Sequence, residues 1–429
     1  MSSPSLGRAA IWIAAGVGSY AFLLGLLITP PLQRFALYAN AFNTLFWDNV
    51  NDGEAFGFAK HQVTPFNIRT PDGETLYAWH ILPTDVYARN EKAIREEGRP
   101  DDRPVEDFTK TVPFNLLTSK DPSPARVLIS FHGNAGHIAQ GWRNEANRFM
   151  AAKPNTHILT IDYRGFGHST GRPTEAGLIL DGVTLVEWIM TVAGIPPERI
   201  VIMGQSLGTA VSSAVALQFA DPKNNLLPVG APELQPLLSV SPSRYPVTFA
   251  GVILAAPFNS IPTLLLTYRM GGLLPLLLPL RPFPYISNLL LSQMVDKWET
   301  AERLAAYYKA LRDSSVLYSK GRTMGSLQIV HAVNDADIPY HQTGMICRRI
   351  LGKRDSQSGL ETDEIDGKSC SGGSSKEASV LDVARPGLPR IRFEIVKHGG
   401  HNRIITYSPV AVAVDRAFDD VFFPAVVGI

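Results

Sequence analysis

Cysteine is scarce in this sequence, and the two that occur form no metal-binding pattern. Cys347 and Cys370 are the only cysteines among 429 residues, and neither belongs to a C-x-x-C pair. The H-E-x-x-H pattern of zinc proteases is also absent. We therefore expect no metal site and no cofactor. The two cysteines could form a disulfide or remain free thiols, so they leave the redox compartment open.

An excess of charge of either sign is also missing. The 40 lysine and arginine residues are balanced by 39 aspartate and glutamate residues, and the formal net charge is +1. Binding of nucleic acid requires a basic patch or stripe, so we expect no nucleic-acid partner. Hydrophobic residues make up 45% of the chain, which is enough to bury a sizeable core.

One long uncharged apolar run lies near the amino terminus. Residues 9–29 could cross a bilayer core of roughly 30 Å as a helix. A cleaved signal peptide is the alternative, but this run is longer than the usual apolar core of such a peptide, and two prolines follow it. We expect a retained single-pass anchor in the endoplasmic reticulum or another endomembrane.

The segments on either side of this run complete the expected amino-terminal region. Residues 1–8 form a tail, and residues 30–60 an amphipathic juxtamembrane connection that lies on the membrane or packs on the domain. Arg8 and Arg34 flank the apolar run too evenly to give its orientation.

Strand-like and helix-like segments alternate through residues 61–429, which we expect to form one α/β domain. A hairpin comes first, with Pro71-Asp72-Gly73 between two strand-like runs. The order predicts a mostly parallel, doubly wound sheet. The later strand-like runs are Arg126–Phe131, His157–Ile161, Arg199–Met203, Gly251–Ala256, Leu327–His331 and Ile391–Lys397, and the helix-like segments include Gly141–Ala151, Glu175–Val192 and Leu207–Phe219.

Several segments interrupt this alternation. A leucine- and proline-rich stretch begins a cap insertion, at about residues 258–320, over the carboxyl edge of the sheet; a pair of core helices is the alternative. Residues 221–246 and 352–390 are expected to be flexible insertions. Residues 87–111 are charged and without periodicity, which predicts a solvated loop.

A G-x-S-x-G pattern stands at Gly204–Gly208, directly after a strand-like run and before a helix-like one. In this setting the pattern forms a nucleophile elbow, a sharp turn that lifts the serine hydroxyl above the sheet. The flanking glycines allow the two backbones to approach closely. We therefore predict Ser206 as the nucleophile of a serine hydrolase. Ser169 stands in a second match, but its strand ends too early and a proline follows, so we place it in a loop.

A serine nucleophile needs a base and an acid that orients the base, and in this fold they follow in the order Ser, Asp, His. Asp335 follows a strand-like run and is the expected acid, with Asp337 as the neighbouring alternative. His401 follows two glycines after the last strand-like run and is the expected base, with His398 as the alternative.

The negative charge that develops on the substrate oxygen needs backbone N–H donors. We assign one donor to Leu207, directly after the nucleophile. We assign the other to Asn134, with Ala135 as its neighbour, in the glycine-containing loop after Phe131. His132, in the same loop, is expected to be a structural brace.

Taken together, these motifs resemble the Bem46-like α/β-hydrolase-domain serine hydrolases, a group that includes membrane-anchored lysophosphatidylserine and monoacylglycerol lipases. The resemblance implies the α/β-hydrolase fold and the triad Ser206, Asp335 and His401, and it gives Asp162 and Arg164 a structural role. The matching segments are His132–Gly136, Asp162–Ser169, Gly171–Leu178 with Asp181, Gly204–Gly208, Asp335 and Gly400–Asn402.

We therefore expect a membrane-anchored serine hydrolase that acts on lipid acyl esters such as lysophospholipids or monoacylglycerols. An anchor beside an apolar cap suits a substrate that partitions into bilayers. A protein acyl-thioesterase of the same fold and a peptidase are the enzymatic alternatives. A non-catalytic membrane scaffold is the alternative from another class.

Overall fold

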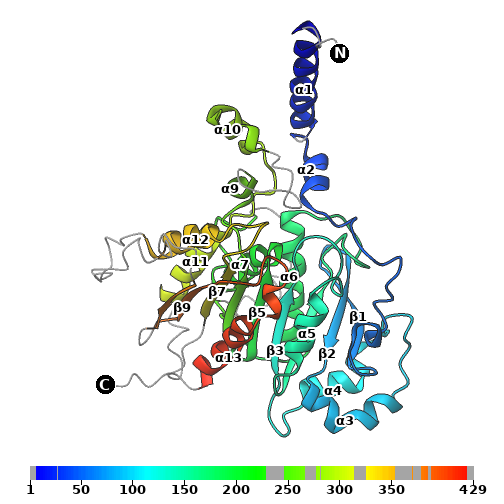
Figure 1. Cartoon of the computed structure of the whole chain (residues 1–429). Helices are drawn as coiled ribbons and strands as arrows, with labels where there is room; N and C mark the ends of the chain where they lie inside the picture. The colour runs from blue at the N-terminus through cyan, green and yellow to red at the C-terminus, as the bar shows by residue number, and fades with distance from the viewer. Residues whose placement is uncertain are drawn as a thin grey trace.

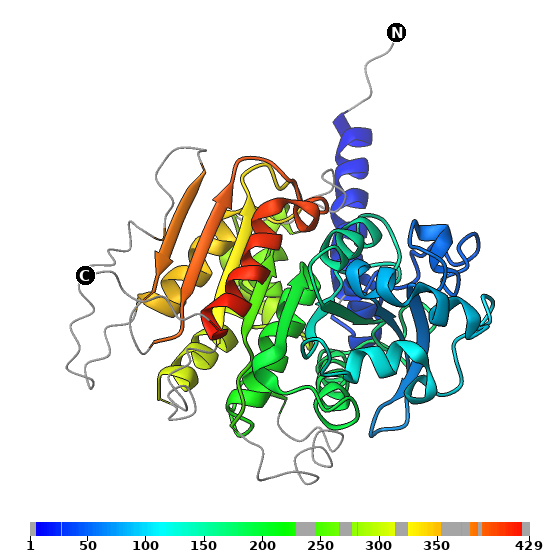
Figure 2. The same cartoon turned by 90° about the horizontal axis from the view of Figure 1, so that it is seen from below.

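A computed structural model describes residues 6–26, 28–228, 246–265, 277–280, 282–313, 325–352, 370, 378–384 and 388–422. Nine strands form one sheet in the order β1-β2-β4-β3-β5-β6-β7-β9-β8, with helices on both faces (Figures 1 and 2). The strands are β1 (Val63–Arg69), β2 (Thr75–Ile81), β3 (Arg126–Phe131), β4 (Thr156–Ile161), β5 (Ile200–Gln205), β6 (Gly251–Ala255), β7 (Ser326–Ala332), β8 (Ser379–Val383) and β9 (Ile391–Val396).

The central six strands, from β4 to β9 across the sheet, are parallel, whereas β1, β2 and β8 pair antiparallel at the two ends. The predicted mostly parallel, doubly wound sheet is confirmed. Strand β3 lies between β4 and β5, so the chain leaves it to one side and returns on the other. Such a switch point opens a crevice at the carboxyl ends of the strands, where ligands bind in open α/β sheets.

Both faces of the sheet are buried, as parallel strands require. Along β3, Ile129 packs into the core on one face and Leu128 into the core on the other. The first face is covered by α6 (Glu175–Thr191), α7 (Leu207–Ala220), α11 (Thr300–Asp313) and α12 (His341–Leu351), and the second by α5 (Arg143–Ala151) and α13 (Ser408–Phe422). Helix α7 is buried almost throughout, which fixes the segment that follows the elbow.

The prediction of a loop at residues 87–111 is wrong in its first part, where helix α3 (Thr84–Glu96) forms. Charged pairs one turn apart, such as Glu91 with Arg95, support the exposed side of this helix. Ile94 is fully buried on the other side. The helix was missed because its many charged residues leave only a narrow apolar face, which gives a weak helical periodicity in the sequence. The short helix α4 (Val112–Thr118) follows.

The amino-terminal apolar run forms α1 (Leu6–Leu26), which projects from the body in Figure 1, followed by α2 (Pro30–Leu37). Among the described residues, no single helix is both long and apolar enough to span a bilayer. Ile11–Leu26 and α2 pass that test only as a pair, with a bend of 98° between them. The single transmembrane helix therefore stays a prediction.

The described part of the predicted cap contains α9 (Ile261–Leu265), a 3-10 turn (Leu278–Leu280) and α10 (Pro284–Ser292), which lies near α1 in Figure 1. Leu24 of α1 packs with Leu277, Leu280 and Leu291. Helix α11, also within the predicted range, lies instead in the helical layer against α7. Residues 266–276 and 314–320 of that range lie outside the described residues.

The two predicted insertions are described only in part. Residues 229–245 of the first, and most of 352–390, lie outside the described residues. Within the second, β8 forms an edge strand beside β9. Cys347 and Cys370, whose state the sequence left open, form a disulfide. The remaining 3-10 turns are Gly53–Phe56, Phe108–Lys110, Pro197–Arg199 and Ile404–Thr406.

Candidate active site

Ser206 lies in the sharp turn between β5 and α7, at the carboxyl edge of the sheet. Its φ of +52° is rare for a residue with a side chain. Its N–H donates to the carbonyl of Ala255 at 3.1 Å, which ties the turn to β6. A Cβ on Gly208 would lie 2.1 Å from the carbonyl oxygen of Phe131, so only glycine permits α7 to start this close to β3.

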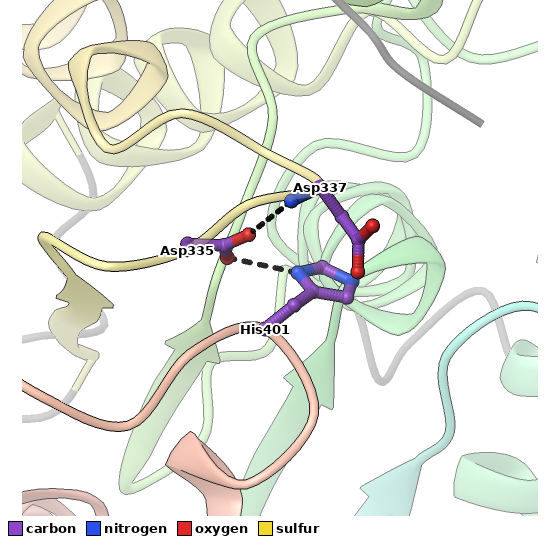
Figure 3. A group of neighbouring side chains, drawn as sticks. All are labelled: Asp335, Asp337 and His401. Carbon is purple, nitrogen blue, oxygen red and sulfur yellow. Dashed lines mark hydrogen bonds and ion pairs between the residues drawn. The ribbon is translucent and has the colours of Figure 1, made fainter. Parts of the chain in front are cut away.

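The structure brings Ser206, His401 and Asp335 together, although 195 residues separate the serine from the histidine. The Ser206 Oγ lies 3.0 Å from Nε2 of His401. On the other side of the ring, Nδ1 of His401 lies 2.8 Å from Oδ2 of Asp335 (Figure 3). A carboxylate can only accept, so Nδ1 carries the ring proton and Nε2 is free to accept the serine proton. Gly400, with a φ of +57°, makes the turn that places His401.

Asp335 is held by several donors, and its side chain is fully buried. Its Oδ1 accepts the N–H groups of Asp337 and Ile338 at 2.9 and 2.8 Å, and Nε2 of His331 lies 3.2 Å from Oδ2. Burial alone would raise the pKa of Asp335, but hydrogen bonds from His331 and His401 outweigh it and lower that pKa below its ordinary value. Asp335 is therefore charged and fixed in orientation.

The three alternative residues lie in different surroundings. The Asp337 carboxylate is half-buried beside His401, on the side of the ring away from Asp335 (Figure 3). His398 is exposed at the end of β9. Ser169 is buried in a loop, where its hydroxyl donates to the carbonyl of Asp162 at 2.6 Å and accepts the N–H of Tyr77 at 2.9 Å. Ser169 thus has a structural partner on each side.

The two predicted oxyanion donors lie on either side of Ser206. Leu207 is the first residue of α7, so its N–H has no carbonyl within the helix to bond. A Cβ on Gly133 would lie 3.3 Å from the Ser206 Cβ, which places the loop before Asn134 directly against Ser206. The Ala135 N–H donates to Oδ1 of Asn134 at 3.0 Å, which favours Asn134 over Ala135 as the second donor.

Two side chains that the sequence did not single out shape this site. The partly buried guanidinium of Arg143 donates to the carbonyls of residues 133, 134 and 135 at 2.8 to 3.0 Å, and to that of His137. The Gln205 amide donates to the His401 carbonyl at 3.0 Å. Gln205 stands inside the elbow motif, whereas Arg143 had no motif to identify it.

The loop residues given a structural role lie behind the site. His132 is buried against Tyr163, and burial lowers its pKa well below the ordinary value. Burial raises the pKa of Asp162 to about 7, although its carboxylate accepts the N–H groups of Ile138 and His168. Arg164 pairs with buried Asp181 at 2.8 Å.

One group of possible metal ligands occurs among the described residues, and it overlaps the candidate active site. Atoms of Asp335, Asp337 and His401 lie within 4.8 Å of one another. Both ring nitrogens of His401 are already hydrogen-bonded, to Asp335 and to Ser206. A metal ligand must offer a free nitrogen lone pair, so this geometry suits proton transfer better than metal binding.

A family model described as "Alpha/beta hydrolase family" matches residues 127–416. A crystal structure of an alpha-beta hydrolase from Vibrio vulnificus aligns with a TM-score of 0.51 at 12% identity, covering 92% of this chain and 95% of that one. At this identity the likeness shows the fold alone.

Three curated relatives share part of the chain. Protein ABHD12B of Homo sapiens is 31% identical over 43% of this chain and 44% of its own. Protein bem46 of Schizosaccharomyces pombe is 38% identical over 25% of this chain and 36% of its own. Lysophosphatidylserine lipase ABHD12 of Danio rerio is 26% identical over 50% of each. The chain spans about half the length of these relatives or less.

Proposed function

This chain belongs to the alpha/beta hydrolase family, within the Bem46-like group that its motifs resemble, and we propose that it is a serine hydrolase of lipid acyl esters. The substrates we propose are lysophospholipids or monoacylglycerols. The single observation that carries the proposal is the hydrogen-bonded sequence from Ser206 through His401 to Asp335, with a proton acceptor already facing the hydroxyl.

The proposed reaction begins when the Ser206 Oγ attacks the ester carbonyl and passes its proton to Nε2 of His401. Asp335 stabilises the resulting imidazolium. The N–H groups of Leu207 and Asn134 stabilise the negative oxygen of the tetrahedral intermediate. His401 then gives its proton to the departing alcohol, which leaves an acyl group on Ser206. Water, deprotonated by His401, releases the fatty acid by the same steps.

A lipid substrate is supported by the exposed apolar side chains of α10 and α1. On α10 and at its start, the side chains of Phe283, Tyr285, Ile286 and Leu289 are each at least half exposed. Helix α1, which packs against the cap through Leu24, exposes a further apolar surface. Large contiguous apolar surfaces mark sites of protein or membrane interaction. We propose that both helices meet the bilayer of the endoplasmic reticulum or another endomembrane.

The relatives point to the same substrate class. Several carry the name lysophosphatidylserine lipase, and they align with half of this chain or less. The membrane anchor and the substrate class therefore belong to the proposal. The assignment to lysophospholipids rests on these names together with the apolar surface, and monoacylglycerols are included because of the resemblance of the motifs.

The proposal is tested by fluorophosphonate labelling of membranes that contain the full-length chain. Labelling of the wild type and of Ser169→Ala, but not of Ser206→Ala, would support Ser206 as the nucleophile. Unlabelled but correctly folded wild type would contradict the proposal and favour a non-catalytic scaffold. The rates of hydrolysis of a lysophospholipid, a monoacylglycerol and a palmitoyl thioester would then be compared. A clear preference for the thioester would indicate that the substrates are acylated proteins rather than lipid esters.

A further inference from the structure

The segment that follows α1 reaches into the candidate active site. Residues 33–40, which we call the juxtamembrane clamp, contact three parts of the domain that are far away in the sequence. These parts are the loop after β3, the loop after β4 and residues 293–298, which follow α10. The clamp thus lies between the helix expected in the membrane and the residues expected to do the chemistry.

The first contact involves the side chain of Asn134. Its Oδ1 accepts the N–H of Ala39 at 3.1 Å, and its Nδ2 donates to the carbonyl of Leu37 at 2.6 Å. The amide thereby pairs with the clamp backbone much as a neighbouring strand would. The same residue carries the backbone N–H that we assign to the oxyanion hole.

The loop that carries Asn134 has little regular structure of its own. Ala135 and Gly136 both have positive φ, at +66° and +68°, so hydrogen bonds from outside must hold the loop in place. Arg143 supplies such bonds to the loop carbonyls. The clamp supplies the bonds to the Asn134 side chain.

The remaining contacts fasten the clamp itself. The Asn40 amide donates to the carbonyl of Gly165 at 2.7 Å. The Tyr38 hydroxyl donates to Oδ2 of Asp296 at 3.0 Å and accepts Nε1–H of Trp298 at 3.1 Å. Arg34 pairs with the same carboxylate at 3.1 Å. Tyr38 and Asp296 are almost completely buried, so Tyr38 anchors the clamp in the domain core.

We propose that the juxtamembrane clamp is a positioning element for catalysis, which fixes the Asn134 N–H in the oxyanion hole through the Asn134 side chain. The inference rests on the proposed function. An oxyanion hole acts only if its donors are aimed before the charge develops, and a misplacement of about 1 Å can cost about a hundredfold in rate. The juxtamembrane connection would then be required for activity as well as for attachment.

The test breaks one contact from both sides in the full-length, membrane-bound chain. Asn134→Ala removes the side chain and keeps the backbone N–H. Ala39→Pro removes the opposing donor, and Tyr38 already has the extended backbone that a following proline favours. We expect each variant to slow fluorophosphonate labelling of Ser206 about ten- to a hundredfold, because that reagent also places a negative oxygen in the hole. The double variant should be no slower than the slower single variant.

A soluble ester such as p-nitrophenyl butyrate separates positioning from a general loss of structure. Positioning predicts a fall in kcat with KM within about twofold, because the hole binds the transition state rather than the ester. Asn43→Ala is the matched control, since the Asn43 side chain bonds to Asn40 and Leu45, which are close to it in the sequence, and to no other described residue. It should label at the wild-type rate.

Several results would overturn the inference without touching the proposed function. Wild-type labelling rates in both Asn134→Ala and Ala39→Pro would show that the clamp does not position the hole. Slowing in Ala39→Pro alone would show that the clamp does not act through the Asn134 side chain. Slowing in Asn134→Ala alone would exclude the Ala39 bond as the positioning contact, because this variant also loses the bonds to Leu37 and Ala135. Failure of the wild type to label would instead refute the proposed function.

Discussion

Replacing Asp335 by asparagine tests whether Asp335 is the acid that orients His401 and His401 the base that accepts the serine proton. The amide keeps the shape of the carboxylate but removes its charge, and its NH₂ can donate to Nδ1 of His401. Nε2 would then carry the ring proton and could no longer accept the proton of Ser206. The imidazolium that forms during attack would also lose its counter-charge.

The expected magnitude follows from the distance between the two groups. Nδ1 of His401 and Oδ2 of Asp335 are 2.8 Å apart, and the carboxylate is fully buried. At an effective dielectric constant of about 20, two unit charges at this separation interact by roughly 6 kcal/mol. Each 1.36 kcal/mol is about tenfold in rate, so Asp335→Asn should lower kcat/KM about 10⁴-fold.

Asp337→Asn is the matched control two residues away. Its carboxylate lies within 4.8 Å of the nearest His401 nitrogen and is half exposed. With a dielectric constant of about 60 for a solvated group, the interaction is roughly 1 kcal/mol, and the loss should stay below about tenfold. Both variants would be assayed with p-nitrophenyl butyrate and by the rate of fluorophosphonate labelling. An equal loss in both variants, or a larger one in Asp337→Asn, would refute the assignment of Asp335 as the acid.

Three further predictions concern stability and are checked by thermal unfolding of the purified chain. Gly208→Ala should prevent folding or lower the free energy of unfolding by more than about 4 kcal/mol, because the alanine Cβ would overlap the Phe131 carbonyl oxygen. A melting temperature equal to that of the wild type would contradict the close approach of α7 to β3. Arg164→Met should cost about 3–5 kcal/mol by leaving the buried Asp181 carboxylate without its partner. The loss should be smaller at pH 5 than at pH 7, because protonation neutralises that carboxylate; equal losses would contradict this reasoning. Burial lowers the pKa of His157 to about 3, below its unfolded value of about 6.5. Between these two pH values the unfolded chain binds a proton at His157 and the folded chain does not. Stability should therefore fall as pH drops below about 6.5, by about 2 kcal/mol at pH 5 for this residue, and His157→Gln should remove that part of the acid sensitivity; an unchanged acid sensitivity would contradict it.

The parallel strands could be predicted to within two residues at each end. Their continuous apolar runs are typical of strands buried on both faces, and glycine, proline or charged residues bound them. Residues 126–131 illustrate this, since prediction and structure agree at both ends. Strand β8 could not be found in the same way, because it lies at the sheet edge and none of its residues is buried. Its pairing with β9, rather than its own pattern, makes it a strand.

The proximity of the predicted site residues follows from fold topology. Each of Ser206, Asp335 and His401 comes directly after a strand of the parallel sheet, and the carboxyl ends of such strands meet at one edge. The contacts of Asn134 with Leu37 and Ala39 could not be predicted in this way. About 95 residues separate the partners, and the bonds involve backbone groups, which every residue type carries. The role of Arg143 could not be predicted for a similar reason, since its partners are backbone carbonyl groups.

The backbone at Ser206 has a consequence for how the chain tolerates change. Positive φ at a residue with a side chain costs about 1–3 kcal/mol, and glycine avoids most of that penalty. Ser206→Gly should therefore fold at least as well as Ser206→Ala, which keeps the strain. Of the six non-glycine residues with positive φ in the described part of the chain, Ala135, Ser206 and Ala256 follow the neighbouring strands β3, β5 and β6, at the edge where the serine lies. A lineage released from selection for activity could become more stable by replacing Ser206 with glycine, so stability alone would be a poor guide to whether such a descendant is active.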